Sequence, residues 1–351
     1  MTTKLQELKA KCHSHSYPEN IQVIARVKNE NLVNFSFNNK SHRSVKFYDV
    51  GSMTKIMVTV PLCMILYERK ILDLSVPVEN YLKYFRGTPV GRINIKKLLR
   101  HDSGLEAWRP YYKKLIKVMP NERISALKEI FRKEKVKNRA QALYSDLDFI
   151  ILGWVIEDIL DMSLDEAAET YIFRTLNMKN TFFRPSEHIK NLKLVAPTRK
   201  NKERGIIQGD VFDDNSWAMD GISGHAGLFS TAEDVTRLGQ SYLDLYFDKS
   251  SSFVKGATLR FFVKRAIPQK KGDWGLGFTL PSRPVSTAGT KVSLKAFGHV
   301  GYTGTSLWIE PLRSAVVTVL SNGTYPRYTN EKFKSLRREI HDLVWELIDG
   351  Q

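Results

Sequence analysis

The sequence has little of what marks secreted, disulfide-stapled or membrane-spanning proteins. Its two cysteines, Cys12 and Cys63, are too few for a disulfide framework, and Cys63 lies in an apolar segment typical of a buried free thiol. The most apolar run, 56–67, is too short to span a bilayer and contains Pro61. Residues 5–15 are polar and lack the apolar core of a secretion signal. We therefore expect no membrane span and a cytoplasmic location, since a periplasmic one would require a longer precursor.

Metal-binding and cofactor-binding signatures are also missing from the sequence. The eight histidines are scattered along the chain, with no HExxH spacing and no paired CxxC motifs that would hold a zinc ion. We therefore predict no metal site and no cofactor.

What the sequence does have is an excess of positive charge. The net charge of +17, from 54 basic and 37 acidic residues, would suit nucleic acid, an anionic lipid surface or an anionic polymer as a partner. The excess is concentrated in residues 111–139, whose apolar spacing indicates an amphipathic helical region with a basic outer face. No zinc finger, basic zipper or RNA-recognition signature accompanies it. We favour a solvated face over nucleic-acid binding.

The order of strand-like and helix-like patterns predicts the secondary structure. Residues 21–38 alternate apolar and polar side chains on both sides of a turn at 28–31, which indicates a β-hairpin. The middle of the chain shows helical spacing, and strand patterns return after residue 272. We predict helices at 53–70, 95–99, 147–161, 235–246 and 333–348, and further strands at 274–280, 291–299, 305–310 and 315–321.

Strands at both ends with helices between them indicate an α/β (α+β) fold, in which an antiparallel sheet is flanked by helices and carries an inserted helical subdomain. The chain of 351 residues has no internal repeat and no linker rich in Gly, Ser or Pro, so it suits one large core. We predict a single domain over residues 1–351. Within it, 18–70 and 225–351 form the sheet subdomain, and 71–224 form the helical subdomain.

The segment Ser52-Met53-Thr54-Lys55 is the first that suggests chemistry. A serine hydroxyl is a weak nucleophile until a base removes its proton. At a helix start, Ser52 and Lys55 lie on one face, and the backbone N–H groups there suit a developing oxyanion. Burial can hold such a lysine neutral. The alternative is a helix cap followed by a solvated lysine, which fits poorly because Lys55 runs into an apolar segment.

Two later segments add to this pattern. Tyr144-Ser145-Asp146 stands directly before the apolar segment 147–161, where a tyrosine can project its hydroxyl into a cleft. The alternative is a packed aromatic ring with Asp146 as the helix cap. His299-Val300-Gly301-Tyr302-Thr303-Gly304 follows a predicted strand, and its glycines let the backbone approach a ligand. The alternative here is a glycine-rich β-turn.

Taken together and in this order, the three segments resemble the SxxK, YxN and HxG motifs of the penicillin-recognising serine hydrolases. The version in this chain is most similar to the family of class C β-lactamases, D-alanyl-D-alanine carboxypeptidases and esterases. The resemblance runs from about Ile21 to Ile348 and includes the supporting segments 98–105 and 224–232. It implies a β-lactamase-like fold and hydrolysis through an acyl-enzyme.

The resemblance also implies the catalytic roles. Ser52 would be the nucleophile, and Lys55 the base or proton shuttle. Tyr144 would share the proton with Lys55 and deliver it to the leaving group. The backbone N–H groups of Ser52 and Tyr302 would form the oxyanion hole.

The remaining motif residues would contact the substrate. Gly301 and Tyr302 would line the binding site, and His299 would replace the strand lysine of the family and contact a substrate carboxylate or the Tyr144 oxygen. Asp146 departs from the usual Asn, which puts recognition of an amide in doubt because a carboxylate cannot donate the hydrogen bonds of an amide. Asp146 would instead pair with Lys55 or favour a cationic substrate group.

Five other polar residues are not assigned chemistry. His101 and His225 match structural positions of the resembled family, so we expect structural roles for both. The loop that contains 213–215 is expected to border the cleft.

We predict a serine hydrolase that acts on an ester, amide or β-lactam carbonyl of a small-molecule or peptide substrate. The absence of a secretion signal argues against a periplasmic cell-wall enzyme, and His299 in place of lysine argues against an efficient β-lactamase. An esterase or peptidase-like activity is therefore favoured. The alternative is a non-catalytic protein of the same fold that binds an anionic polymer through its basic surface. It gives no physical reason for a lysine within an apolar helix.

Overall fold

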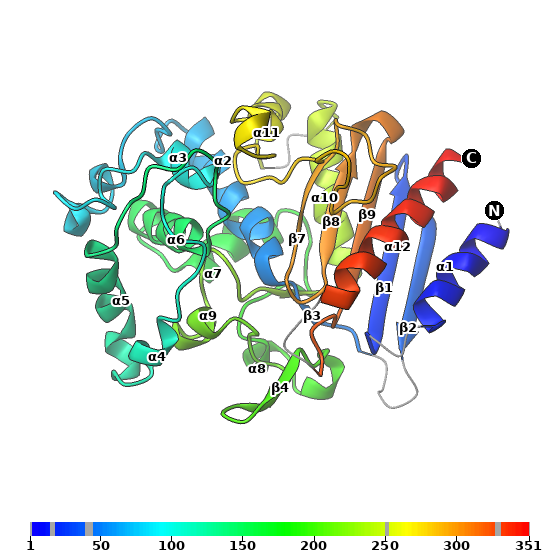
Figure 1. Cartoon of the computed structure of the whole chain (residues 1–351), viewed down its shortest axis with the longest axis horizontal. Helices are drawn as coiled ribbons and strands as arrows, with labels where there is room; N and C mark the ends of the chain where they lie inside the picture. Colours follow the sequence, from blue (N-terminus) through cyan, green and yellow to red (C-terminus); the bar gives the residue numbers. More distant parts are fainter. Residues whose placement is uncertain (1, 15–17, 39–44, 250–252, 327–330, 351) are drawn as a thin grey trace.

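The computed structural model describes residues 2–14, 18–38, 45–249, 253–326 and 331–350. Its centre is a five-stranded antiparallel sheet built from both ends of the chain (Figure 1). The spatial order is β2-β1-β9-β8-β7. The strands are β1 (Asn20–Val27), β2 (Glu30–Asn38), β7 (Phe297–Val300), β8 (Ser306–Glu310) and β9 (Ala315–Ser321).

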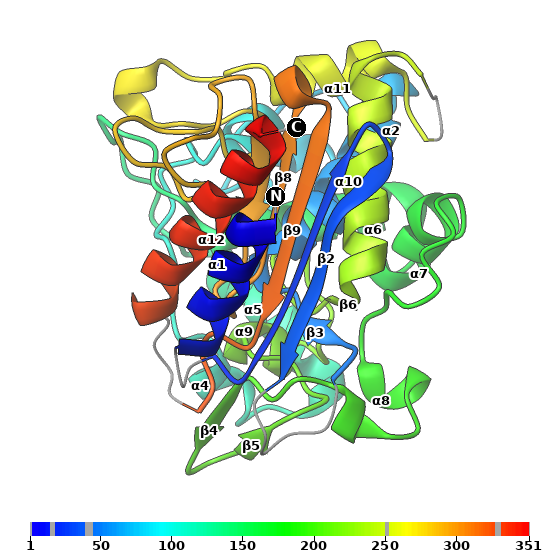
Figure 2. The same cartoon turned by 90° about the vertical axis from the view of Figure 1, so that its right-hand side faces the viewer.

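Helices cover both faces of this sheet. The terminal helices α1 (Thr2–Ser14) and α12 (Glu331–Asp349) lie side by side on one face, and α10 (Ala232–Tyr246) lies on the other (Figure 2). The strands alternate accordingly. Val317 and Val319 belong to the apolar cluster under α12, whereas Val316 and Leu320 belong to the cluster on the α10 side. The two apolar layers hold the ends of the chain together.

The middle of the chain forms the mainly helical part beyond one edge of the sheet (Figure 1). Short strands join it to the rest, and β3 pairs with β6. The remaining elements are α2 (Val60–Glu68), α3 (Ile95–Leu99), α4 (Tyr112–Leu115), α5 (Arg123–Arg132), α6 (Asp146–Leu160), α7 (Leu164–Ala168), α8 (Pro185–His188), α9 (Asp214–Ala218), α11 (Gly256–Val263), β3 (Tyr48–Asp49), β4 (Arg199–Asn201), β5 (Gly205–Ile207) and β6 (Phe229–Ser230).

The structure confirms the predicted fold class and most of its elements. The hairpin at 21–38 is present as β1 and β2, and the predicted helices at 95–99, 147–161 and 333–348 correspond to α3, α6 and α12. The helix predicted at 53–70 is less regular. It begins with a 3-10 turn at Gly51–Met53 and a π-helical turn at Lys55–Thr59, before α2 starts beside Pro61.

Two strand predictions near the C-terminal end were wrong or too long. Residues 274–280 form only isolated bridges, because Gly277 has φ +83° and lies so close to α2 that a side chain there would meet Val60. The strand predicted at 291–299 shortens to β7. Its earlier backbone donors bind carboxylates instead, since Glu310 accepts from the Ser293 N–H and Asp342 from the Lys291 N–H.

Within the described part of the chain, no helix is both long enough and apolar enough to cross a lipid bilayer.

Candidate active site

Ser52 is held at the junction between the sheet and the helical part. It follows β3 and lies in the first helical turn, directly after Gly51, whose φ is +54°. A Cβ atom on Gly51 would lie 3.3 Å from the Tyr302 backbone nitrogen and 3.3 Å from Thr303 Oγ1. Glycine therefore suits this position both by its backbone conformation and by the close approach of the β7–β8 turn.

Hydrogen bonds fasten this turn to the segment before Ser52. Thr303 Oγ1 donates to the Asp49 carbonyl at 2.8 Å, and Thr305 Oγ1 donates to the Val50 carbonyl at 2.8 Å. Arg337 of α12 supports the turn from behind by donating to the carbonyls of Gly301 and Thr305. The predicted oxyanion-hole segments, at Ser52 and Tyr302, are thus brought together from opposite ends of the chain.

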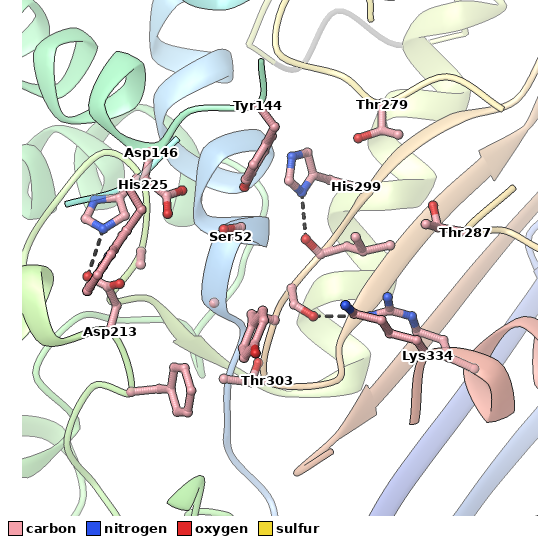
Figure 3. A pocket seen from close by; sticks show the side chains of 18 of the residues that line it. Ser52, Tyr144, Asp146, Asp213, His225, Thr279, Thr287, His299, Thr303 and Lys334 are labelled. Carbon is pink, nitrogen blue, oxygen red and sulfur yellow. Dashed lines mark hydrogen bonds and ion pairs between the residues drawn. The ribbon is translucent and has the colours of Figure 1, made fainter. Parts of the chain in front are cut away.

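Ser52 faces a cavity of about 590 Å³ (Figure 3). Tyr144, Asp146 and His225 lie on the side of the helical part, and His299 and Thr279 lie on the other side. All seven predicted site residues except the buried Lys55 line this cavity. Aromatic and polar side chains that the motifs did not indicate complete the lining: Trp108, Phe212, Asp213, Trp274, Thr279, Thr287, Lys334 and Arg337.

Lys55 is fully buried beneath Ser52. Its Nζ lies 2.9 Å from Ser52 Oγ, 2.7 Å from Asp146 Oδ1 and 3.2 Å from the His225 carbonyl oxygen. Burial alone would lower the pKa of Lys55, but the attraction of Asp146, together with Tyr144, outweighs it, so the pKa lies above its usual value. Burial alone therefore does not decide the charge of Lys55, and Asp146 favours its protonated form. The structure places Asp146 in the predicted pair with Lys55.

Tyr144 lies two residues before the start of α6, with its ring stacked on Trp274 at a centroid distance of 5.7 Å. Lys55 Nζ lies 4.9 Å from the centre of the Tyr144 ring. Burial raises the pKa of Tyr144, and Lys55 offsets only part of this effect, so the hydroxyl keeps its proton at neutral pH. Hydrogen bonding from Ser52 and Lys55 also acts on the phenol oxygen. Ser52, Lys55 and Tyr144 are thus in mutual contact.

His101 positions the start of α6. It is buried, and its Nδ1 accepts a hydrogen bond from the Ser145 N–H at 3.1 Å and lies 3.2 Å from Asp148 Oδ2. Its ring also packs on Tyr144 at a centroid distance of 4.7 Å. These contacts fit the expected structural role.

His299, on β7, is a neutral residue on the side of the cavity opposite Asp146 and His225. Its Nδ1 lies 2.8 Å from the Val300 carbonyl oxygen and donates to it, because a carbonyl can only accept. Burial lowers the pKa of His299 to about 3, and the charge of Lys55 adds to this effect. Among the described residues its Nε2 has no hydrogen-bond partner. A neutral imidazole carries no charge with which to hold a substrate carboxylate.

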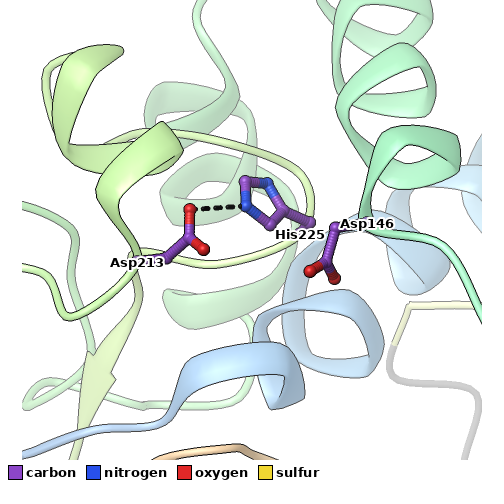
Figure 4. A group of neighbouring side chains, drawn as sticks. All are labelled: Asp146, Asp213 and His225. Atoms are coloured by element: carbon purple, nitrogen blue, oxygen red, sulfur yellow. Dashed lines mark hydrogen bonds and ion pairs between the residues drawn. The ribbon is translucent and has the colours of Figure 1, made fainter. Parts of the chain in front are cut away.

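Asp146, Asp213 and His225 form a compact group beside Ser52 (Figure 4). Asp213 Oδ1 lies 2.9 Å from His225 Nε2 and accepts from the Ser216 N–H at the start of α9. Burial would raise the pKa of Asp213, but His225 and this N–H outweigh it and hold the pKa below its usual value. Aspartate and histidine are common metal ligands. Here each ligand atom already has a protein partner, since Asp146 pairs with Lys55 and His225 with Asp213.

Sequence reasoning therefore missed several residues of the cavity. Asp213 was placed near the cleft without a role, and no motif indicated Lys334 or Arg337 on α12 or the aromatic side chains of the rim. The helical pattern of 333–348 located α12 but carried no signal for which of its side chains reach the site.

Comparisons with known proteins identify the family of this chain. The β-lactamase family model matches residues 22–339. A Salmonella gallinarum protein named D-alanyl-D-alanine carboxypeptidase is 31% identical over 311 residues, which cover 81% of this chain and 71% of the relative. A Salmonella typhi protein of the same name is 30% identical over 311 residues, with the same coverage.

Solved structures share the whole architecture. EstCE1, described as a hydrolase with promiscuous acyltransferase activity, aligns with a TM-score of 0.75 at 17% identity and covers 98% of both chains. A class C β-lactamase from Rhodobacter sphaeroides aligns with a TM-score of 0.71 at 18% identity and covers 99% of both chains. These likenesses show the fold, and the family match over residues 22–339 shows that the chain belongs to the β-lactamase family of serine hydrolases.

Proposed function

We propose that this protein hydrolyses an ester or a peptide bond through an acyl-enzyme on Ser52. The observation that carries the proposal is the contact between Lys55 Nζ and Ser52 Oγ, 2.9 Å long, at the floor of an open cavity. A lysine buried beside a serine, together with Tyr144, is an arrangement that can move the serine proton. The neighbouring N–H groups of Ser52 and Tyr302 would stabilise the oxyanion.

The proposed reaction has two halves, formation and hydrolysis of the acyl-enzyme, and Lys55 and Tyr144 transfer protons in both. Ser52 Oγ attacks the carbonyl carbon as its proton passes into the Lys55 and Tyr144 network. The tetrahedral intermediate collapses to an acyl-enzyme when Tyr144 protonates the leaving group. Water then attacks the ester on Ser52, and the same network removes the proton of the water and returns one to Ser52.

Two features favour a substrate with a carboxylate near the scissile bond. Lys334 and Arg337 line the cavity on the α12 side and make this side electropositive. The Salmonella relatives are named for an activity on D-alanyl-D-alanine, which ends in a carboxylate. The neutral His299 does not add to this attraction, so we propose that a carboxylate would be held by α12.

The first test is intact-mass spectrometry after incubation with a fluorophosphonate and, separately, with a fluorescent penicillin. One adduct that is absent in Ser52→Ala would support the proposed nucleophile. A panel of p-nitrophenyl esters, D-alanyl-D-alanine peptides and a chromogenic cephalosporin then identifies the preferred carbonyl. If a folded wild-type protein forms no adduct with either probe, the hydrolase proposal fails, and the basic surface should be tested for salt-sensitive binding of anionic polymers.

A further inference from the structure

The chemistry proposed for Ser52 requires an acceptor for its proton, and Lys55 cannot accept one while its amine is protonated. An ammonium group has three N–H donors and no lone pair. Lys55 Nζ lies 2.9 Å from Ser52 Oγ, 2.7 Å from Asp146 Oδ1 and 3.2 Å from the His225 carbonyl, and it also hydrogen-bonds the Tyr144 phenol oxygen. A carboxylate and a carbonyl can only accept, so these contacts fit the protonated amine. Lys55 therefore donates to Ser52 in the resting site.

Tyr144 is not a ready acceptor either. Its hydroxyl stays protonated in the resting site because burial raises its pKa more than Lys55 lowers it. A neutral phenol can pass a proton along only if another group takes up the one that it releases. The resting site therefore contains a neutral nucleophile, a neutral phenol and a protonated amine, and it needs an anion to complete the transfer.

Asp146 is that anion. In the described part of the chain, it is the one carboxylate within hydrogen-bond distance of Lys55 Nζ. It is the first residue of α6, where the helix dipole favours negative charge, and its backbone is fixed by a hydrogen bond from its N–H to the Ala107 carbonyl. The sequence motif therefore places a proton acceptor where the resembled family has a neutral amide.

The other titratable groups around Lys55 do not compete for this role. Burial raises the pKa of Asp148 well above its usual value, which disfavours its anion, and Asp148 lies next to His101 and not next to Lys55 Nζ. Asp213 is held by His225 and the Ser216 N–H. The pKa values of His101 and His299 are lowered first by burial and then by the charge of Lys55.

We infer that Asp146 stores, through Lys55, the proton that leaves Ser52, so that the Lys55–Asp146 pair works as the base of this enzyme. This inference rests on the proposed acyl-enzyme function. It makes Asp146 a positioning residue for proton transfer, since Asp146 acts through Lys55 and does not touch the scissile bond.

In this scheme the proton lost from Ser52 ends on the leaving group, and every other residue returns to its starting protonation state by the end of acyl-enzyme formation. Lys55 passes one proton to Asp146 Oδ1, and rotation about its Cε–Nζ bond turns the resulting lone pair towards Ser52. The Oγ–H bond of Ser52 breaks, its proton moves to Nζ, and Oγ bonds to the carbonyl carbon while the C=O electron pair moves to oxygen. When the bond to the leaving group breaks, Tyr144 protonates that group. Tyr144 recovers a proton from Lys55, which recovers one from Asp146.

The test is the pH dependence of Ser52 labelling by a fluorophosphonate in wild type and Asp146→Asn. In the wild type, the pKa of Lys55 lies above its usual value, so the Lys55–Asp146 ion pair keeps its transferable proton through neutral pH and the labelling rate should be nearly flat there. Asp146→Asn removes the acceptor and leaves neutral Lys55 as the only base. We expect the labelling rate at pH 7 to fall by about 100-fold and to recover as pH rises.

Three further variants separate proton storage from simple support of the fold. Asp146→Glu retains a carboxylate, so it should keep the flat profile even if the rate falls. Lys55→Arg keeps a cation beside Asp146 but cannot release a proton, so it should label too slowly to measure at any pH. Asp165→Asn removes a carboxylate that pairs with Arg184 outside the cavity, and it should match the wild type.

These experiments distinguish a failure of the inference about Asp146 from a failure of the proposed hydrolase function. A wild-type protein that does not label refutes the function itself. A wild type that labels, with an Asp146→Asn variant of equal or higher rate at pH 7 and an unchanged profile, overturns the inference and makes Lys55 alone the base. If Asp146→Asn does not fold, an Asp146→Glu variant with a steeply pH-dependent rate overturns it equally, because that variant still carries the acceptor.

Discussion

The polar side chains on the two sides of the cavity differ in charge. The charged wall, formed by Asp146, Asp213 and His225 and backed by the buried Lys55, joins ionisable groups at distances of 2.7 to 2.9 Å. The neutral wall, formed by Thr279, Thr287 and His299, holds its histidine uncharged. Proton transfer needs groups that gain and lose a proton during the reaction. Binding of a substrate in a fixed position needs groups whose protonation state does not change. We therefore expect the charged wall to serve proton transfer and the neutral wall to serve substrate placement.

The largest expected effect comes from Ser52, which lies between the two walls. Ser52→Ala should lower the turnover of a reactive p-nitrophenyl ester by about 10⁴-fold or more, because the variant lacks the hydroxyl on which the proposed acyl-enzyme forms. Steady-state kinetics together with circular dichroism of the variant measure this. A folded Ser52→Ala protein that keeps a tenth of the wild-type rate would place the nucleophile elsewhere. The roles expected for the two walls would then be wrong as well.

Tyr144 tests the link from the charged wall to the leaving group. Tyr144→Phe keeps the ring against Trp274 but removes the hydroxyl, so we expect kcat to fall by about 10²- to 10³-fold with little change in stability. The loss should be smaller for esters with a good leaving group, such as p-nitrophenol, than for peptides, because a phenolate can depart without a proton. Equal losses for both substrates would show that Tyr144 does not protonate the leaving group.

The neutral histidines on the sheet side predict acid sensitivity of the fold. Burial lowers the pKa of His341, which contacts Ser306 under the sheet, to about 3. A histidine whose pKa is depressed by folding stabilises the protein above its unfolded pKa of about 6.5 and loses that contribution as pH falls.

This acid sensitivity can be isolated by comparing two proteins. Between pH 6.5 and pH 5, the free energy of unfolding of the wild type should fall by about 2 kcal/mol relative to that of His341→Gln. Urea denaturation at both pH values measures the difference. A constant difference would mean that His341 is not held neutral in the folded state.

The smallest effect is expected from placing a charge in the neutral wall. His299→Lys introduces an ammonium group near Ser52, so the KM for a peptide that ends in D-alanyl-D-alanine should fall by about threefold to tenfold. The KM for the same peptide with an amidated end provides the control and should change little. A fall in both values would show that His299→Lys changes the shape of the site and not its charge.

The sequence predicted the parts of the molecule that depend on local pattern. The alternation in 21–38 gave the hairpin, and three short motifs located Ser52, Tyr144 and His299 around one cavity. The prediction of a strand at 274–280 failed because the left-handed Gly277 and its contact with α2 break the strand, and both depend on tertiary packing. The protonation of Lys55 could not be read from the sequence either, since it depends on Asp146, which lies 91 residues away along the chain.

The fastening of the β7–β8 turn to the segment before Ser52 has a consequence for when activity can arise. A nascent chain that ends before residue 300 already contains Ser52, Lys55 and Tyr144, but it lacks Tyr302 and the Thr303 hydroxyl that binds Asp49. Arg337, which supports the turn, is synthesised later still. The surroundings of Ser52 are therefore completed only when the last part of the chain has been synthesised, so a shorter nascent chain would lack half of the proposed oxyanion hole.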